Sequence, residues 1–258
     1  MERLDVEIKS LTERLCLLKT ERNSLSVTYT LPAEILAEIF VVVQEEIKRG
    51  YSSGRRAAFA KYGWLSMTRT SRHWRQVALE CPRLWCDIRV GTLPPPMIQI
   101  FLARSGGRNL SVEVNGLARS GGRDLSAEVF GPPRRGGRHW VEYGEVFAEA
   151  LRFEKLEFSL ERKTFSRLLS QLISTPLPQL RSLSISGDVT IPDDIFQGTT
   201  PQLHSLSLRQ CQFSLDSPLL SPNLTTLDLS YCHMGSTTLG DLYSYPEKLW
   251  RRSFTPAI

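Results

Sequence analysis

The residues that could do chemistry are few and lie far apart in this chain. The four histidines are His73, His139, His204 and His233, and the five cysteines are Cys16, Cys81, Cys86, Cys211 and Cys232. They form no CxxC or HExxH arrangement, and no GxSxG, Walker loop or GxGxxG after a strand occurs. We therefore expect a non-catalytic protein without a metal site or cofactor. An odd number of scattered cysteines indicates reduced thiols, and hence the cytoplasm or the nucleus.

A second group of side chains, tryptophan together with arginine, is typical of surfaces that bind nucleic acid. Residues 64–85 contain three tryptophans, four arginines and one acidic residue. Base stacking requires aromatic rings and cations on one open face. Here Trp74, Val77 and Ala78 recur at helical spacing, whereas most arginines lie off that stripe. The spacing predicts a helix over 65–80 that ends before Pro82, with Trp74 facing the interior or a partner.

Another amphipathic helix is predicted just upstream. Pro32 is tolerated only in a first helical turn, and Thr30 is a suitable cap. The helical period then predicts one apolar face that carries Ile35, Leu36, Ile39, Phe40 and Val43. The polar, glycine-containing residues 48–56 are expected to form a loop, and residues 83–85 to turn back against the helices.

Together these segments resemble an F-box of the kind abundant in mushroom-forming fungi. The residues that carry the resemblance, within 31–90, are Leu31, Pro32, Glu34, Leu36, Ile39, Phe40, Trp74, Arg75, Ala78, Pro82, Leu84 and Trp85. The chain departs from the family pattern in a longer loop between Phe40 and Trp64, and in Ser71 where a cysteine is often found. The resemblance implies a three-helix module, residues 29–91, that binds the Skp adaptor of a cullin–RING ubiquitin ligase.

The same resemblance and the apolar pattern predict which residues bind the adaptor. They are Leu31, Pro32, Ile35, Leu36, Ile39, Phe40, Trp74, Val77, Leu84 and Trp85. A small helical module cannot bury all of its apolar surface alone, which favours an exposed patch that a partner covers. The alternative is that all of these residues form the core.

Residues 1–28 are predicted to form an amphipathic helix with a heptad repeat. Leu4, Ile8, Leu11, Leu15 and Leu18 are spaced 4, 3, 4 and 3 apart, and Leu25 continues the series with Arg22 in the intervening position. Such a pattern indicates a self-associating coiled coil over residues 4–25. The alternatives are a helix that packs on its own domain, or a frayed arm.

Residues 92–140 contain a tandem duplication and are expected to form a linker. LARSGGRNLSVEVNG, residues 102–116, is followed by LARSGGRDLSAEVFG, residues 117–131, and by a degraded third copy over 132–146. Each clear copy predicts a helix end or turn closed by two glycines, and then a short strand. Seven arginines and three acidic residues over 101–138 give a basic segment. RNA contact through phosphates is one interpretation. A duplicated unit with a basic surface is the favoured one, because no aromatic residue follows the first two Gly-Gly-Arg units.

Residues 141–258 resemble leucine-rich repeats. Segments that begin at Phe153, Leu180, Leu203 and Leu224 align on L-x-x-L-x-L, 27, 23 and 21 residues apart. The resemblance implies a short solenoid whose parallel strands form a concave face, with helices or loops behind it. Residues 165–173 predict one such helix. Cys211 and Cys232 stand at the consensus Asn/Cys position, which predicts a structural role for both.

Strand alternation predicts which side chains point outward and could hold a protein target. They are Glu157, Ser182, Ser184, Ser205, Ser207, Arg209, Thr226 and Asp228. After Cys232, Leu239, Leu242 and Leu249 predict one last helix. Otherwise we expect the array to be truncated.

The expected fold is therefore α+β to α/β: an N-terminal helix, a three-helix F-box and a short leucine-rich-repeat solenoid with a parallel sheet. The expected function is that of a substrate-receptor subunit of an SCF-type ubiquitin ligase. The alternatives are a leucine-rich interaction scaffold whose F-box-like helices are only a cap, and RNA binding through the arginine-rich middle. The longest run of aliphatic and aromatic residues, 39–43, is far too short for a membrane span, and the charged start is not a secretory signal.

Overall fold

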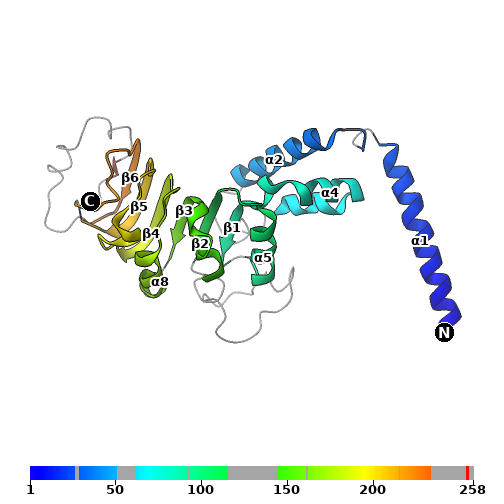
Figure 1. The fold of residues 1–258 in the computed structure, drawn as a ribbon, viewed down its shortest axis with the longest axis horizontal. Helices are drawn as coiled ribbons and strands as arrows, with labels where there is room; N and C mark the ends of the chain where they lie inside the picture. The colour runs from blue at the N-terminus through cyan, green and yellow to red at the C-terminus, as the bar shows by residue number, and fades with distance from the viewer. Residues whose placement is uncertain are drawn as a thin grey trace. The chain divides into compact units, whose positions relative to one another are not determined.

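The chain divides into two compact units, Met1–Leu84 and Trp85–Ile258. The structure, a computed structural model, describes residues 1–26, 29–50, 62–91, 93–115, 144–160, 162–214, 216–233 and 254–255. In the described residues the first unit is helical, and the second combines helices with a parallel sheet (Figure 1). The second unit thus has the α/β character expected from the sequence.

The first unit contains helices α1 (Glu2–Ser24), α2 (Ala33–Gly50) and α4 (Arg72–Glu80), and the 3₁₀ helix η2 (Gly63–Arg69). The 3₁₀ helix η3 (Pro82–Trp85) begins in the first unit and ends at the first residue of the second. α2, η2 and α4 pack against one another. Their buried side chains are Leu36, Phe40, Gln44, Trp64, Met67, Val77 and Ala78. The buried Gln44 amide donates a hydrogen bond to the Leu84 carbonyl oxygen at 2.9 Å, which offsets the cost of removing this donor from water.

The helix predicted over 65–80 is divided into two helices. η2 ends at Arg69 and α4 begins at Arg72. Ser71 has extended backbone angles, and its hydroxyl accepts a hydrogen bond from the Trp74 N–H at 3.1 Å. An N-cap serine of this kind satisfies a free donor of the first turn and starts a new helix. The prediction missed the break because the apolar spacing continues across it.

The second unit contains a sheet whose strands follow one another in chain order. The strands are β1 (Asp87–Val90), β2 (Leu110–Asn115), β3 (Phe153–Ser159), β4 (Ser182–Thr190), β5 (Ser205–Gln212), β6 (Thr226–Ser230) and the short β7 (Phe254–Thr255). Each strand pairs in parallel with the next.

Parallel neighbours require crossover connections, and helices fill several of them. α5 (Pro95–Arg104) follows β1 and packs against it. α8 (Arg162–Ser174) packs against β4 and against η5 (Ile195–Gly198), and η4 (Ala150–Arg152) precedes β3. Figure 1 shows α5 beside β1. α8 confirms the helix predicted over 165–173, and its Phe165, Leu168 and Leu172 are buried.

The strand register aligns the repeated leucines in two rows. Leu156, Leu183, Leu206 and Leu227 form one row, and Phe158, Ile185, Leu208 and Leu229 form the next. All but Leu227 are buried. The alignment of the four segments on L-x-x-L-x-L is therefore confirmed as a structural register.

The sheet begins earlier in the chain than the repeat pattern indicated. β1 and β2 lie before residue 141, in stretches expected to belong to the helical module and to the linker. The first copy of the duplicated segment has the predicted order of helix end, turn and strand, because α5 ends at Arg104, Gly106 and Gly107 have φ of 59° and 75°, and β2 follows. The second copy and residues 132–143 of the third, with Arg123 and Arg138, lie outside the described residues, as do Leu239, Leu242 and Leu249.

Candidate protein-binding surfaces

One side of α2 is an apolar stripe exposed to solvent. Ile35 and Ile39 are 51% and 42% exposed, and Val42 and Val43 are exposed as well. Spacings of four and three residues place Ile35, Ile39 and Val42 above one another on the helix. The exposed Pro32 extends the stripe by one turn. We call Pro32, Ile35, Ile39, Val42 and Val43 the α2 outer face.

The neighbouring side of α2, about 100° further around the helix, belongs to the core of the first unit. Leu36, Phe40 and Gln44 are buried, and the Phe40 ring lies 5.2 Å from the Trp74 ring between centroids. The sequence placed Leu36 and Phe40 on one face with Ile35 and Ile39, and that prediction was wrong. Adjacent residues differ by about 100° around a helix, so two neighbouring apolar stripes share α2, one packed and one free.

The ten adaptor-binding candidates separate accordingly. Pro32, Ile35 and Ile39 are exposed, and Leu31 and Trp74 are half-buried. The remaining five are buried and are not displayed for a partner: Leu36, Phe40, Val77, Leu84 and Trp85. Val42 was missed, although it lies seven residues after Ile35, a spacing that the helical period places on the same side.

Trp85 belongs to the second unit rather than to the helical module. Its ring packs edge-on against Phe101 with centroids 4.9 Å apart, and the Arg104 guanidinium lies 5.3 Å from the ring centroid. Arg104 is therefore within the range of a cation–π interaction. The Trp85 indole is therefore part of the core of the second unit.

Charged side chains flank the α2 outer face. Glu38 forms an ion pair with Arg83, which follows α4, and Lys48 lies 3.0 Å from Glu45. Exposed pairs of this kind contribute little to stability. They leave an apolar stripe bordered by polar groups, which is the pattern of a protein-binding patch.

The second candidate surface is the polar face of the sheet. The register places Glu157, Ser184, Ser207 and Asp228 in one row, and Ser182, Ser205 and Thr226 in a second row. Arg209 lies in a third row between Ser186 and Ser230. The structure thus brings all eight predicted target-surface residues together on one face, opposite the buried leucine rows.

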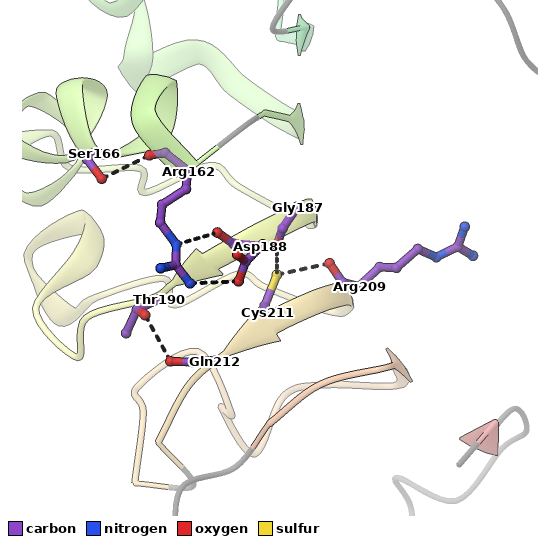
Figure 2. Close-up of polar contacts among 8 residues, drawn as sticks. All are labelled: Arg162, Ser166, Gly187, Asp188, Thr190, Arg209, Cys211 and Gln212. Carbon is purple, nitrogen blue, oxygen red and sulfur yellow. Dashed lines mark hydrogen bonds and ion pairs between the residues drawn. The ribbon is translucent and has the colours of Figure 1, made fainter. Parts of the chain in front are cut away.

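Hydroxyls and one carboxylate form a small network on this polar face. Ser207 donates to Asp228 Oδ2 at 3.2 Å, and Ser230 donates to Oδ1 of the same residue at 3.3 Å. The Arg209 side chain is exposed and extends away from the buried Cys211 (Figure 2). Within the described part of the chain, its guanidinium has no ion-pair partner. This face offers hydroxyls, one free cation and a partly satisfied carboxylate.

The polar face continues into two strands that the sequence analysis did not assign to it. Arg89, Glu113 and Glu157 stand side by side in β1, β2 and β3. The buried Arg89 guanidinium lies 2.7 Å from Glu113, which also accepts a hydrogen bond from the Asn115 amide at 2.9 Å. A short strand was predicted at β2 but not at β1, and the alternation of polar residues at 87, 89, 111, 113 and 115 was the signal that could have placed both strands in this sheet.

Cys211, near the end of β5, and Cys232, just after β6, occupy equivalent places along neighbouring strands. The Cys211 thiol donates to the Ile185 carbonyl at 3.4 Å, and Cys232 donates to the Leu208 carbonyl at 3.2 Å. Figure 2 shows Cys211 directed at the backbone carbonyls of Gly187 and Arg209. Burial raises the pKa of Cys211 to about 12 and also raises that of Cys232. Both remain neutral thiols near pH 7, which suits hydrogen bonding to the backbone rather than nucleophilic chemistry.

The described residues contain no cluster of three or more histidine, cysteine or acidic side chains that could hold a metal ion. Among those same residues, no helix has the length and apolar character needed to cross a bilayer. Comparison with protein-family models, curated proteins and solved structures found no match. The surfaces themselves therefore carry the functional argument.

Proposed function

We propose that this protein is a substrate-receptor subunit of an SCF-type cullin–RING ubiquitin ligase, and that its helical unit is an F-box. The observation that carries the proposal is the α2 outer face. Its exposed Pro32, Ile35 and Ile39 lie within the LPAEILAEIF segment on which the F-box resemblance rests. The buried Leu36 and Phe40 of the same segment hold α2 on its own unit.

An exposed aliphatic stripe of this kind favours docking against another protein. Covering Ile35 and Ile39 would remove roughly half of each side chain from water, worth about 1 kcal/mol apiece. Apolar anchors at i, i+4 and i+7 match recognition in which a helix lies in an apolar groove of its partner. We therefore assign the Skp adaptor to the α2 outer face.

The second unit supplies the target-binding surface in this proposal. We interpret it as a leucine-rich-repeat domain, because it adds one parallel strand per repeat and carries Cys211 and Cys232 at equivalent positions. Its polar face displays residues from neighbouring strands, as an extended recognition surface requires. The receptor would hold its target there while the ligase transfers ubiquitin.

Co-purification with a Skp adaptor tests the proposal on the full chain. Ile39→Asp should weaken adaptor binding at least tenfold, because it places a charge within an apolar contact. Ile100→Asp is the matched control, since Ile100 is 41% exposed but lies on α5 of the second unit. Unchanged thermal unfolding of both variants would show that the fold is retained.

Two results would overturn the proposal: a wild-type chain that binds no Skp adaptor, or an Ile39→Asp variant that binds as well as wild type. Leu36→Asp would be a poor test, although the sequence alone recommends it. Leu36 is only 1% exposed, so a charge there would disrupt the core and remove binding for an unrelated reason.

A further inference from the structure

α1 is a helix without a packed side. It spans Glu2–Ser24 and has no buried residue. The apolar residues at its a and d heptad positions, which we call the seam, are all exposed, with 51–84% of each residue accessible to solvent. They are Leu4, Ile8, Leu11, Leu15, Leu18 and Leu25. Most helical stability in proteins comes from the packing of an apolar face, so the stability of α1 depends on what covers the seam.

We propose that α1 pairs with α1 of a second copy of this chain to form a two-stranded coiled coil. The width of the apolar stripe on α1 indicates what kind of partner covers it. A helix that packs on a globular unit carries a broad stripe with a third apolar position in each heptad. In α1 both positions that flank the seam are polar throughout: Asp5, Glu7, Thr12, Arg14, Lys19 and Glu21.

The narrow 3.5-residue repeat is self-complementary. It stays on one side of a helix only when two such helices supercoil around each other, so the natural partner of this seam is an identical seam. Two apolar residues, Val6 and Leu17, are exposed outside the seam, and a dimer would leave them in solvent.

The residues of the seam favour two strands over larger bundles. Leucine occupies each d position at 4, 11, 18 and 25, and the first two complete a positions hold Ile8 and Leu15. Leucine at d together with a β-branched residue at a, as at Ile8, favours dimers. Arg22 occupies another a position, and a guanidinium there reaches water from a two-stranded seam more readily than from a larger bundle.

The contact would be weak and therefore sensitive to concentration. Fully burying a leucine removes roughly 60–120 Å² from water. Six side chains on each helix, each more than half exposed, then bury on the order of 400–800 Å² in total. That area is below the roughly 1,200–2,000 Å² of stable specific interfaces, so we expect a transient dimer with a dissociation constant in the micromolar range.

Sedimentation velocity of the full chain across the micromolar range tests this proposal. We expect the wild-type mass to rise from monomer to dimer with concentration. Leu11→Asp and Leu15→Asp should weaken association at least tenfold. Leu17→Asp is the matched control, because Leu17 is 65% exposed on the same helix but outside the seam.

A wild-type chain that stays monomeric over this range would overturn the proposal, and so would equal loss of association in Leu17→Asp. None of these substitutions removes a buried side chain, and Leu17→Asp lowers the helix propensity of α1 as much as the seam variants do, so a loss confined to the seam variants is not an effect on folding. The α1 variants should still bind a Skp adaptor if the F-box proposal holds. The two proposals can therefore fail independently.

Discussion

Substitution of Gly187 is the most direct test of the packing in the second unit. It lies in a bulge of β4, between Ser186 and Val189, with φ of +148°. A Cβ atom added there would overlap the Leu160 carbonyl oxygen and would lie 3.2 Å from the carbonyl carbon. Gly187→Ala must therefore strain the backbone and also push two chain segments apart.

The cost of this substitution is the sum of two effects. The backbone angle contributes roughly 1–3 kcal/mol for a residue with a side chain. Separation of the segments weakens the hydrogen bond from the Leu160 N–H to the Ser186 carbonyl, now 3.1 Å, at about 1 kcal/mol. A total of about 3 kcal/mol should lower the melting temperature of the second unit by roughly 6–12 °C.

Thermal unfolding followed by circular dichroism measures the shift, and Gly107→Ala is its control. Gly107 also has a positive φ, +75°, but a Cβ atom there meets nothing within 4 Å. It should lose only about 1 kcal/mol through backbone strain. Equal melting temperatures for the two variants would refute the close approach of Gly187 to Leu160.

Three further predictions test the core and the strand ends. In urea unfolding, Leu36→Ala should lower the free energy of unfolding by about 2–5 kcal/mol, whereas Ile35→Ala should change it by less than about 0.5 kcal/mol. Similar losses in the two variants would contradict the assignment of Leu36 to the core and Ile35 to the surface of α2. Gln210→Gly should stabilise the second unit by up to about 1 kcal/mol in the same assay, because φ of 57° is unfavourable for glutamine, and a loss of stability would count against it. The pKa of the Cys211 thiol is 9.0 ordinarily and about 12 in the fold, so the thiol ionises at lower pH in the unfolded chain. Its contribution to stability is therefore complete below pH 9 and is lost as the pH rises toward 12. Cys211→Ala should flatten the fall in unfolding free energy between those pH values, and an unchanged slope would contradict the burial of the thiol.

The strands that could be read from the sequence were those with repeated leucines. Leu183, Leu206 and Leu227 mark their strands through side-chain identity and spacing, and the register follows because each strand pairs with the next. β1 and β2 were missed as parts of the same sheet. They use isoleucine and valine in the same alternation, so the pattern of the repeat motif does not extend to them.

The division of α2 into two sides could not be predicted from periodicity alone. Ile35 and Leu36 are both aliphatic and lie about 100° apart on the helix, so either could face the core. Only tertiary packing selects Leu36 and Phe40, because η2 and α4 lie against that side of α2. The residues of the target surface were easier to predict, since side chains alternate between the two faces of a sheet along each strand.

The strict chain order of the strands has a consequence for how the second unit folds. Each described strand pairs only with the strands before and after it in the chain, as Ser205 of β5 does with Thr226 of β6. Because each strand contacts only its neighbours, folding can nucleate at any strand pair and spread from there along the sheet. Unfolding should then proceed inward from the ends of the sheet, and the strands next to α8 should show the slowest amide hydrogen exchange.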